Sequence, residues 1–138
     1  MSLASDHPFA ILFDPIRIGP VTAPNRFYQV PHCNGMGWRM PESLAAMRGV
    51  KAEGGWGVVC TEEVEIHHSS DLSPYFEGRL WEADDTPSLA RMADAVHAHG
   101  ALAAIAARHD THLTIQEQMT LERAETRSLA EMSARYRD

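Results

Sequence analysis

The chain has 138 residues and carries 19 acidic against 12 basic side chains, which gives a formal net charge of −7 at pH 7. This length suits one domain with a sizeable core. The acidic balance disfavours nucleic acid and anionic membranes as partners, because their phosphates repel a negative surface. No apolar run approaches the roughly eighteen residues of a membrane helix, and the first residues lack a basic segment followed by an apolar core. We therefore expect a cytoplasmic protein.

The first elements predicted along the chain are a flexible arm, a hairpin and a strand. Residues 1–10 are polar without periodicity, which is typical of an arm. Ile11–Ala23 places alternating side chains around a turn at residues 19–20, and this pattern predicts a small hairpin. Phe27–Val30 is rich in β-prone residues, and Pro31 ends this predicted strand because proline cannot donate to a ladder.

A helix and a second strand follow. Pro41 opens a helix in which apolar residues recur about every three positions, and residues 54–55 are glycines that end it. Trp56–Ile66 is apolar at its centre without alternation, which favours a strand covered on both faces. Residues 67–81 are polar, and their length predicts a functional loop.

The last predicted elements are a second helix and a third strand. Asp85 or Thr86 is expected to cap this helix, and Gly100 to stop it. Ala101–Ala106 is the third strand. Strands that alternate with helices through short connections predict an α/β unit with parallel strands and right-handed crossovers.

Three runs of the sequence resemble the start of one enzyme family. They are ILFDPIRIGPVTAPNRFYQVPHCNGMG, RGVKAEGGWGVVCTEEVEIH and ADAVHAHGALAAI. They span Ile11–Ile105 and resemble the trimethylamine dehydrogenase branch of the old yellow enzyme family, which includes the N-methyl amino acid demethylases. The resemblance implies a (β/α)₈ TIM barrel with FMN as cofactor. It also implies oxidation of the C–N bond of a small N-methylated amine or amino acid by hydride transfer to FMN.

The length of the chain conflicts with a complete barrel. Such a barrel needs about 200 to 250 residues, so 138 residues hold only the first few strand-helix units. We expect residues 11–106 to form the N-terminal part of an FMN-binding barrel, about three units long. Residues 107–138 are expected to form a divergent helical tail, because the resemblance breaks beyond Ile105. The family's iron-sulfur cysteines and phosphate-binding loops would belong to a full-length parent and are not in this chain.

A rival interpretation is a truncated, inactive fragment that acts only as an oligomerisation or interaction module. Three parallel strands leave two unpaired edges, so such a fragment would self-associate or pair with another chain to cover them. Flavin absorbance in the purified protein would separate the two interpretations.

The candidate cofactor site is the segment where the first strand ends. The resemblance implies that Val30, Pro31, His32 and Cys33 line the flavin. It also implies that Cys33 carries FMN through a thioether to ring carbon 6, as the cysteine of the matching PHC run does in the amine dehydrogenases. Taken alone, a single cysteine is more often a small buried hydrophobe. A cationic His32 would raise the thiolate fraction of Cys33, and a histidine bonded to a backbone group is at least as plausible.

Glu62 and Glu63 are the candidate catalytic residues, because they lie at the carboxyl end of the second strand, where active sites of TIM barrels are found. Adjacent strand residues point to opposite faces, so at most one of the two faces a bound ring. A solvated loop charge is an equally good account of either. Trimethylamine dehydrogenase has a tyrosine at the position of Glu63, so the carboxylate favours an N–H of a protonated amine over an aromatic cage. This difference points toward N-methylated amino acids.

No metal site is expected, although the chain has eight histidines. His97 and His99 lie in the last turn of a predicted helix, and their spacing does not put them on one face. None of the histidines has a flanking cysteine or carboxylate ligand set. With only Cys33 and Cys60 there is no disulfide framework, and reduced thiols are expected.

Overall fold

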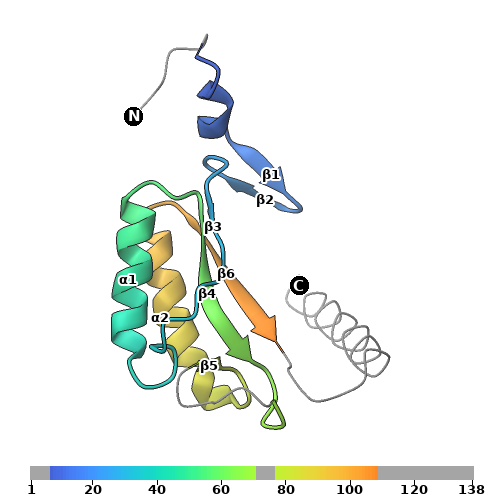
Figure 1. Ribbon diagram of the computed structural model, residues 1–138, viewed down its shortest axis with the longest axis vertical. Coiled ribbons are helices and arrows are strands. Elements are labelled where there is room, and N and C mark those ends of the chain that lie inside the picture. The colour runs from blue at the N-terminus through green and yellow to red at the C-terminus, as the bar shows by residue number, and fades with distance from the viewer. Residues whose placement is uncertain (1–6, 71–76, 109–138) are drawn as a thin grey trace.

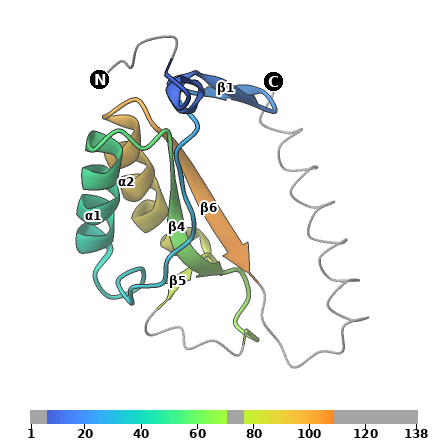
Figure 2. The same cartoon turned by 45° about the horizontal axis from the view of Figure 1, so that its top comes forward.

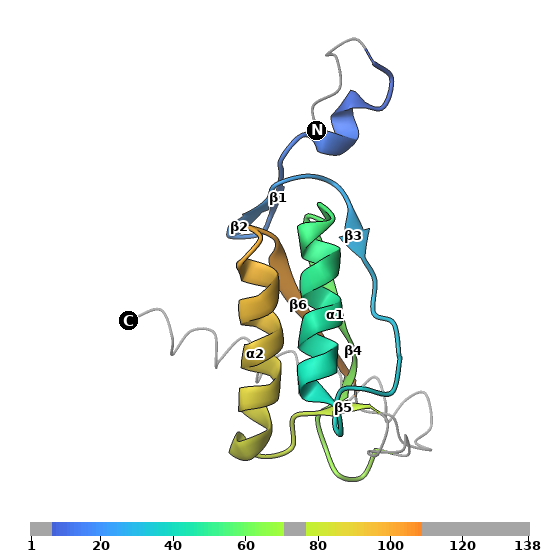
Figure 3. The same cartoon turned by 90° about the vertical axis from the view of Figure 1, so that its left-hand side faces the viewer.

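The computed structural model describes residues 7–70 and 77–108 of the chain. An N-terminal hairpin precedes an α/β unit in which two helices lie over one face of a parallel sheet (Figure 1). Figure 2 shows the hairpin beyond the ends at which the strands of the sheet begin. In Figure 3 the two helices run side by side in front of the strands. This is the α/β arrangement that the alternation of elements predicts.

The described elements follow the predicted order with one additional strand. In chain order they are the 3₁₀ helix η1 (Ala10–Phe13), β1 (Ile16–Ile18), β2 (Val21–Ala23), β3 (Tyr28–Gln29), α1 (Pro41–Glu53), β4 (Val58–Glu65), β5 (Gly78–Arg79), the 3₁₀ helix η2 (Ala83–Asp85), α2 (Thr86–His97) and β6 (Leu102–Arg108). The additional strand, β5, lies in the segment predicted as a loop over 67–81. Its two residues carry no alternation that a sequence pattern could reveal.

The predicted hairpin is confirmed over residues 16–23, whereas the start of the predicted range belongs to η1. β1 pairs with β2 in antiparallel register from Ile16 opposite Ala23 to Ile18 opposite Val21. Gly19 has a φ of 56° in the turn, a left-handed conformation that favours glycine. Most of the arm predicted over residues 1–10 lies outside the described residues.

β4 is the centre of the sheet, and β3, β5 and β6 all run parallel to it. Seven of its eight residues are buried, and Glu63 is the exception. A strand buried on both faces explains why its apolar residues do not alternate. β6 pairs with β4 from Val58 to Glu65, two residues longer at its end than the predicted Ala101–Ala106.

The core lies between the helices and the helix-facing side of the sheet. Its buried residues are Leu44, Ala45, Ala52, Val59, Met92, Val96 and Ala101. Gly49 of α1 lets the two helices approach closely, since a Cβ there would lie 3.5 Å from the Cβ of Ala95 on α2. This packing fixes both crossovers on one side of the sheet.

The predicted cap of α2 is wrong in its chemistry. Asp85 ends η2 and makes no capping hydrogen bond to α2. Its carboxylate instead accepts from Arg79 Nε at 2.7 Å and from the main-chain N–H groups of Trp81 and Glu82 at 3.0 and 3.2 Å. The Asp85 carboxylate is therefore occupied by Arg79 of β5 and by two local amides, and it does not bind the N–H groups in the first turn of α2. These bonds link β5 to the start of α2.

The four-stranded sheet remains open within the described residues, and no barrel is closed. The tail predicted over residues 107–138 lies outside the described residues apart from its first two positions, which continue β6. In the described part of the chain, no helix has both the length and the apolar composition needed to cross a membrane.

Candidate functional site

The loop between β3 and α1 carries Cys33 and runs along one edge of β4. β6 occupies one edge of β4 along its whole length, while β3 pairs only with its first two residues and β5 only with its last two. A strand has two edges, so β3 and β5 share the second edge and leave its middle open. Glu62 accepts hydrogen bonds from the main-chain N–H groups of Asn34 and Gly37, which places the Cys33 loop in this gap. The sheet topology thus brings together the residues predicted for the site.

The four predicted cofactor residues, Val30, Pro31, His32 and Cys33, are all exposed. Val30 is 60% exposed although it is apolar, and Cys33 is a free cysteine. Gly35 has a φ of 72°, so the chain turns back after Cys33 in a conformation that favours glycine. The loop therefore presents a reachable thiol beside apolar surface at the carboxyl end of β3.

Glu62 anchors this loop. Its side chain is fully buried, and its Oε2 accepts a hydrogen bond from the main-chain N–H of Asn34 at 3.0 Å. Its Oε1 accepts the main-chain N–H of Gly37. Both carboxylate oxygens of this predicted catalytic residue are thus engaged by the loop that follows Cys33. A carboxylate held by two amides is a strong acceptor and keeps the loop in one conformation.

Arg48 on α1 holds the other side of the same loop. It is fully buried, its Nη2 donates to the carbonyl of His32 at 2.8 Å, and its Nη1 donates to Gln29 Oε1 at 3.3 Å. Burial lowers the pKa of Arg48 by disfavouring its charge, while the negative charge of Glu62 acts in the opposite direction. Cys33 therefore sits on a loop fastened by two buried groups of opposite charge.

Arg48 was not identified from the sequence. The signal for it is its place on the buried face of α1, which also contains Leu44, Ala45, Gly49 and Ala52. An arginine four positions after a buried leucine shares its face. A cation in that position must find partners inside the protein, because burying an unpaired charge is costly.

A β-bulge interrupts β4 where the two carboxylates lie. Cys60 pairs with Ala104 and Glu63 with Ala106, so two residues of β4 oppose one residue of β6. Thr61 Oγ1 accepts the N–H of Ala106 at 3.0 Å and replaces the lost ladder bond. β4 thus stays hydrogen-bonded to β6 through the bulge. Its two glutamates lie in different environments, since Glu62 is buried and Glu63 is partly exposed.

Glu63 differs from Glu62 in exposure and in partner. Its side chain is 27% exposed, and its Oε1 forms an ion pair with Arg108 Nη1 at 2.5 Å. Arg108 is 45% exposed, so solvent screens this pair and its contribution to stability is small. Acid and base charges are thus presented together at the carboxyl ends of β4 and β6.

Glu63 and a residue that the sequence did not single out, Glu77, lie near enough to the Cys33 thiol to influence its pKa. The pKa of the Cys33 thiol is raised, first by burial and then by the negative side chains of Glu77 and Glu63. The lowering that a cationic His32 would produce is not found, because the shift comes first from burial and then from the negative side chains of Glu77 and Glu63.

A contact between two glycines positions the loop against β5. A Cβ on Gly37 would lie 2.6 Å from the main-chain nitrogen of Gly78, so no side chain fits there. Next to this contact, Arg79 lies over the rings of Trp38 and Trp81 at 5.5 and 5.1 Å. These cation-π contacts give Trp38 a defined partner on β5.

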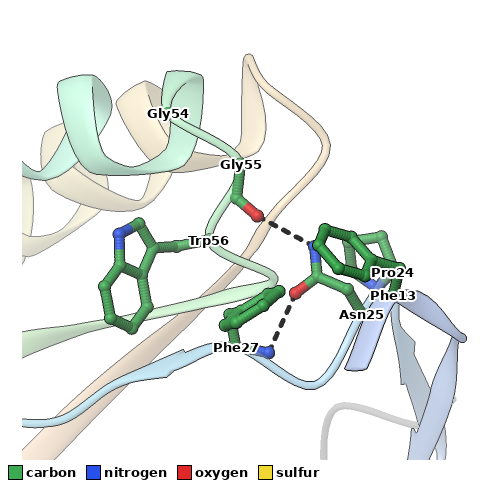
Figure 4. Close-up of a pocket in the computed structure, with 7 residues that line it drawn as sticks. All are labelled: Phe13, Pro24, Asn25, Phe27, Gly54, Gly55 and Trp56. Carbon is green, nitrogen blue, oxygen red and sulfur yellow. Dashed lines mark hydrogen bonds between the residues drawn. The ribbon is translucent and has the colours of Figure 1, made fainter. Parts of the chain in front are cut away.

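A pocket of about 570 Å³ lies at the opposite, amino-terminal end of the strands (Figure 4). It is lined by Phe13, Pro24, Asn25, Phe27, Gly54, Gly55 and Trp56. Asn25 spans it, donating to the Gly55 carbonyl at 2.8 Å and accepting the Phe27 N–H at 3.0 Å. Both functional groups of this amide serve the junction of hairpin and sheet, so the pocket is separate from the Cys33 site.

Comparison with known proteins places the chain among flavin enzymes. The model of the NADH:flavin oxidoreductase / NADH oxidase family matches residues 11–134. This match extends past Ile105, where we expected the resemblance to end. Dimethylamine dehydrogenase from Hyphomicrobium sp. (strain x) is 50% identical over 101 residues, which are 73% of this chain and 14% of that protein.

Solved structures give the same result. Histamine dehydrogenase from Rhizobium sp. 4-9 matches with a TM-score of 0.70 and 59% identity over 73% of this chain and 15% of that chain. The old yellow enzyme homologue from Zymomonas mobilis matches with a TM-score of 0.60 and 27% identity, over 71% of this chain and 28% of that one. The chain therefore spans about one seventh of the length of the amine dehydrogenases.

The shared architecture explains the open sheet. The old yellow enzymes are TIM barrels, and the described α/β unit corresponds to the first part of such a barrel. Identity of about one half to amine dehydrogenases is much higher than the identity to the old yellow enzyme homologue. The chain belongs to the NADH:flavin oxidoreductase / NADH oxidase family of FMN enzymes, in its trimethylamine dehydrogenase-like branch.

Proposed function

We propose that the chain is the N-terminal part of an FMN-dependent oxidoreductase that oxidises the C–N bond of N-methylated amines or amino acids. The observation that carries the proposal is the exposed thiol of Cys33, held at the carboxyl ends of parallel strands by Arg48 and Glu62. Two buried charged groups devoted to one surface loop are costly unless the loop has a task. The names of the most similar relatives support amine oxidation as that task.

The residues at the end of β3 fit a flavin. Val30, Pro31, His32 and Cys33 are exposed together, and the thiol is not used in a disulfide. In the proposed site Val30 and Pro31 supply apolar contact to the ring, and Cys33 supplies the covalent tether. FMN, when bound, supplies the hydride acceptor. The role of this chain is to hold the thiol and to shape one side of the site.

The two carboxylates receive different roles in the proposal. Glu62 has both oxygens bonded to loop amides, so it positions the loop. Glu63 is partly exposed beside Cys33, so it is the residue that faces the substrate. Arg108, the ion-pair partner of Glu63, would bind a carboxylate of the substrate, and Glu63 would bind an ammonium group of the substrate. The pair therefore favours a zwitterionic substrate, such as an N-methylated amino acid, over a simple alkylamine.

A chimera tests the proposed function. Residues 11–108 would replace the matching N-terminal segment of histamine dehydrogenase from Rhizobium sp. 4-9, to which the chain is 59% identical. We expect yellow protein whose flavin stays with the polypeptide after acid precipitation, and complete release of the flavin from the Cys33→Ala chimera. Release of all flavin from the unmutated chimera would contradict the tether. Oxidation of the N-methylated amino acid sarcosine in the tethered chimera tests the substrate class.

A second candidate function, interaction with another chain, is favoured by the free edge of β6. Among the described residues β6 pairs only with β4, and Ile105 is 47% exposed. An open parallel edge is a template for association. Size-exclusion chromatography of the 138-residue chain at several concentrations tests this role: a monomer at every concentration argues against it.

A cytoplasmic location belongs to the first proposal and is supported by the two unpaired cysteines.

A further inference from the structure

The pocket at the amino-terminal end of the strands has a wall of three aromatic rings, in which Phe27 lies between Phe13 and Trp56 (Figure 4). The centroid of the Phe27 ring lies 5.3 Å from that of Phe13 and 6.4 Å from that of Trp56. The ring planes are inclined by 70° and 75°, so neighbouring rings stand nearly perpendicular, like walls that meet at a corner. Phe13 and Trp56 are each 39% exposed, so a ligand can reach their rings from solvent.

Main-chain contacts hold this aromatic wall in place. The N–H of Arg26 donates to the carbonyl of Leu12 at 2.9 Å, which fixes η1 and its ring against the start of β3. A Cβ on Gly57 would lie 2.8 Å from the carbonyl oxygen of Asn25, so a side chain at that position would not fit. The chain directly after Trp56 is thereby held against the hairpin junction. The pocket is therefore formed by the fold of the free chain, as small-molecule sites usually are.

The pocket lies at the negative end of a helix. Gly54 and Gly55 place it at the C-terminus of the 13-residue helix α1, where the helix dipole favours a cation. None of the seven described residues that line it carries a charge, and the charged residues of the last turn, Lys51 and Glu53, are not among them. The carbonyl of Gly55 and the amide oxygen of Asn25 each accept one hydrogen bond and keep a second lone pair. An anion would thus find no cationic partner in the lining, whereas a cation would meet favourable groups.

We propose that this pocket binds a methylated ammonium group, such as the quaternary head of choline, against the rings of Phe13, Phe27 and Trp56. Aromatic faces attract a cation that lies within about 6 Å of the ring centroid, and rings set at an angle enclose its methyl groups. The volume of about 570 Å³ leaves room for a chain attached to this head. The net charge of −7 adds a long-range attraction for cations. The pocket and the Cys33 site lie at opposite ends of the strands, so the inference goes beyond the proposed function.

Nuclear magnetic resonance of the 138-residue chain tests the proposal, because its three tryptophans are separate reporters. Choline would be titrated at constant ionic strength beside 3,3-dimethylbutan-1-ol, which has the same shape without the charge. We expect choline to shift the indole N–H signal of Trp56 with a Kd of about 1 to 10 mM, and the neutral alcohol to bind at least about tenfold more weakly. The signals of Trp38 and Trp81, which lie against Arg79 of β5, should not move.

Two phenylalanines provide matched variants. Phe13→Leu keeps an apolar side chain in the pocket but removes one ring, and Phe9→Leu makes the same change at an exposed position outside it. The affinity for choline should fall about three- to tenfold in Phe13→Leu and stay unchanged in Phe9→Leu. Equal affinities in the two variants would overturn the proposal, because an aromatic ring of the pocket would then contribute nothing to binding.

The wild type alone decides the case in which Phe13→Leu fails to fold. The absence of a saturable shift of Trp56 overturns the proposal, and so does a shift of Trp38 or Trp81 in its place. Equal affinities for choline and for the neutral alcohol also overturn it, since the pocket would then select apolar shape and not charge. None of these readouts involves flavin, so the proposed oxidoreductase function can fail while this inference stands, and the reverse is also possible.

Discussion

The buried carboxylate of Glu62 on β4 accepts the main-chain N–H of Asn34 at 3.0 Å, across 28 residues of sequence. This bond joins the centre of the sheet to the residue directly after Cys33. It makes the conformation of the Cys33 loop dependent on the integrity of β4. The stability of the fold and the geometry of the candidate site are therefore coupled.

Glu62→Gln should destabilise the chain by about 2 to 4 kcal/mol. The amide keeps one acceptor oxygen but turns an NH₂ group toward the N–H of Asn34 or Gly37, so a buried donor loses its partner. Urea unfolding followed by circular dichroism measures the effect, with Glu53→Gln as control. A midpoint equal to that of the control would contradict the anchoring role.

Arg48→Met should cost about 3 to 5 kcal/mol, because it leaves Glu62 without the nearby cation and the His32 carbonyl without its donor. The two residues fasten one loop, so their effects should not add. A double-mutant cycle with Glu62→Gln should give a coupling energy of about 1 to 3 kcal/mol. Strict additivity would show that the loop does not connect them.

Gly37→Ala and Gly49→Ala should have opposite signs. A Cβ at Gly37 meets main-chain atoms of Gly78, so one strand or the loop must move, at about 1 to 3 kcal/mol. At Gly49 the nearest atom is 3.5 Å away, and alanine favours the helix by roughly 1 kcal/mol. Thermal unfolding of both variants provides the comparison. Equal tolerance at the two positions would refute the close approach of loop and β5.

Asp85 should contribute stability that is lost in acid. Burial acts to raise its pKa, but the hydrogen bond from Arg79 and the amides of Trp81 and Glu82 outweigh burial, and the pKa lies below its ordinary value of 3.8. A depressed folded-state pKa stabilises the protein above the unfolded pKa, and the gain disappears as pH falls through the lower folded value. The wild type should thus lose its advantage over Asp85→Asn below about pH 4. Asp84→Asn, at an exposed position, is the control.

Glu63→Tyr should alter substrate preference in the chimera. Tyrosine removes the partner for a substrate N–H and restores an aromatic surface suited to trimethylamine. The ratio of kcat/KM for sarcosine to that for trimethylamine should fall at least about tenfold, which corresponds to one ion pair of about 1.4 kcal/mol. Glu63→Gln separates loss of charge from gain of the ring. An unchanged ratio in both variants would remove Glu63 from substrate recognition.

The sequence predicts those helices and strands whose own residues form a recognisable pattern. Pro41 and the glycines at 54–55 bound α1, and the unbroken apolar centre of β4 reveals a strand covered on both faces. The convergence of Cys33 with Glu62 and Glu63 also follows from the sequence, because the carboxyl ends of parallel strands share one edge. These features depend on local pattern and topology alone.

The remainder depends on tertiary contacts. β5 is a strand only because its backbone pairs with Val64 and Glu65 of β4. The bonds of Glu62 to the loop amides require the bulge and the tight Gly37 contact. Patterns of hydrophobicity contain no trace of such contacts, so the roles of the two glutamates were less predictable than their location.

The bulge in β4 also decides toward which face of the sheet each later residue of β4 points. Paired strand residues share a face, and Val59 points toward the helices. Val58 and Cys60, paired with Leu102 and Ala104, therefore point the other way, as Ala106 of β6 and its partner Glu63 do. Without the extra residue, strict alternation would turn Glu63 under the helices. A one-residue deletion here would exchange the chemistry of the two faces of the sheet, so this short stretch should tolerate substitutions far better than changes in length.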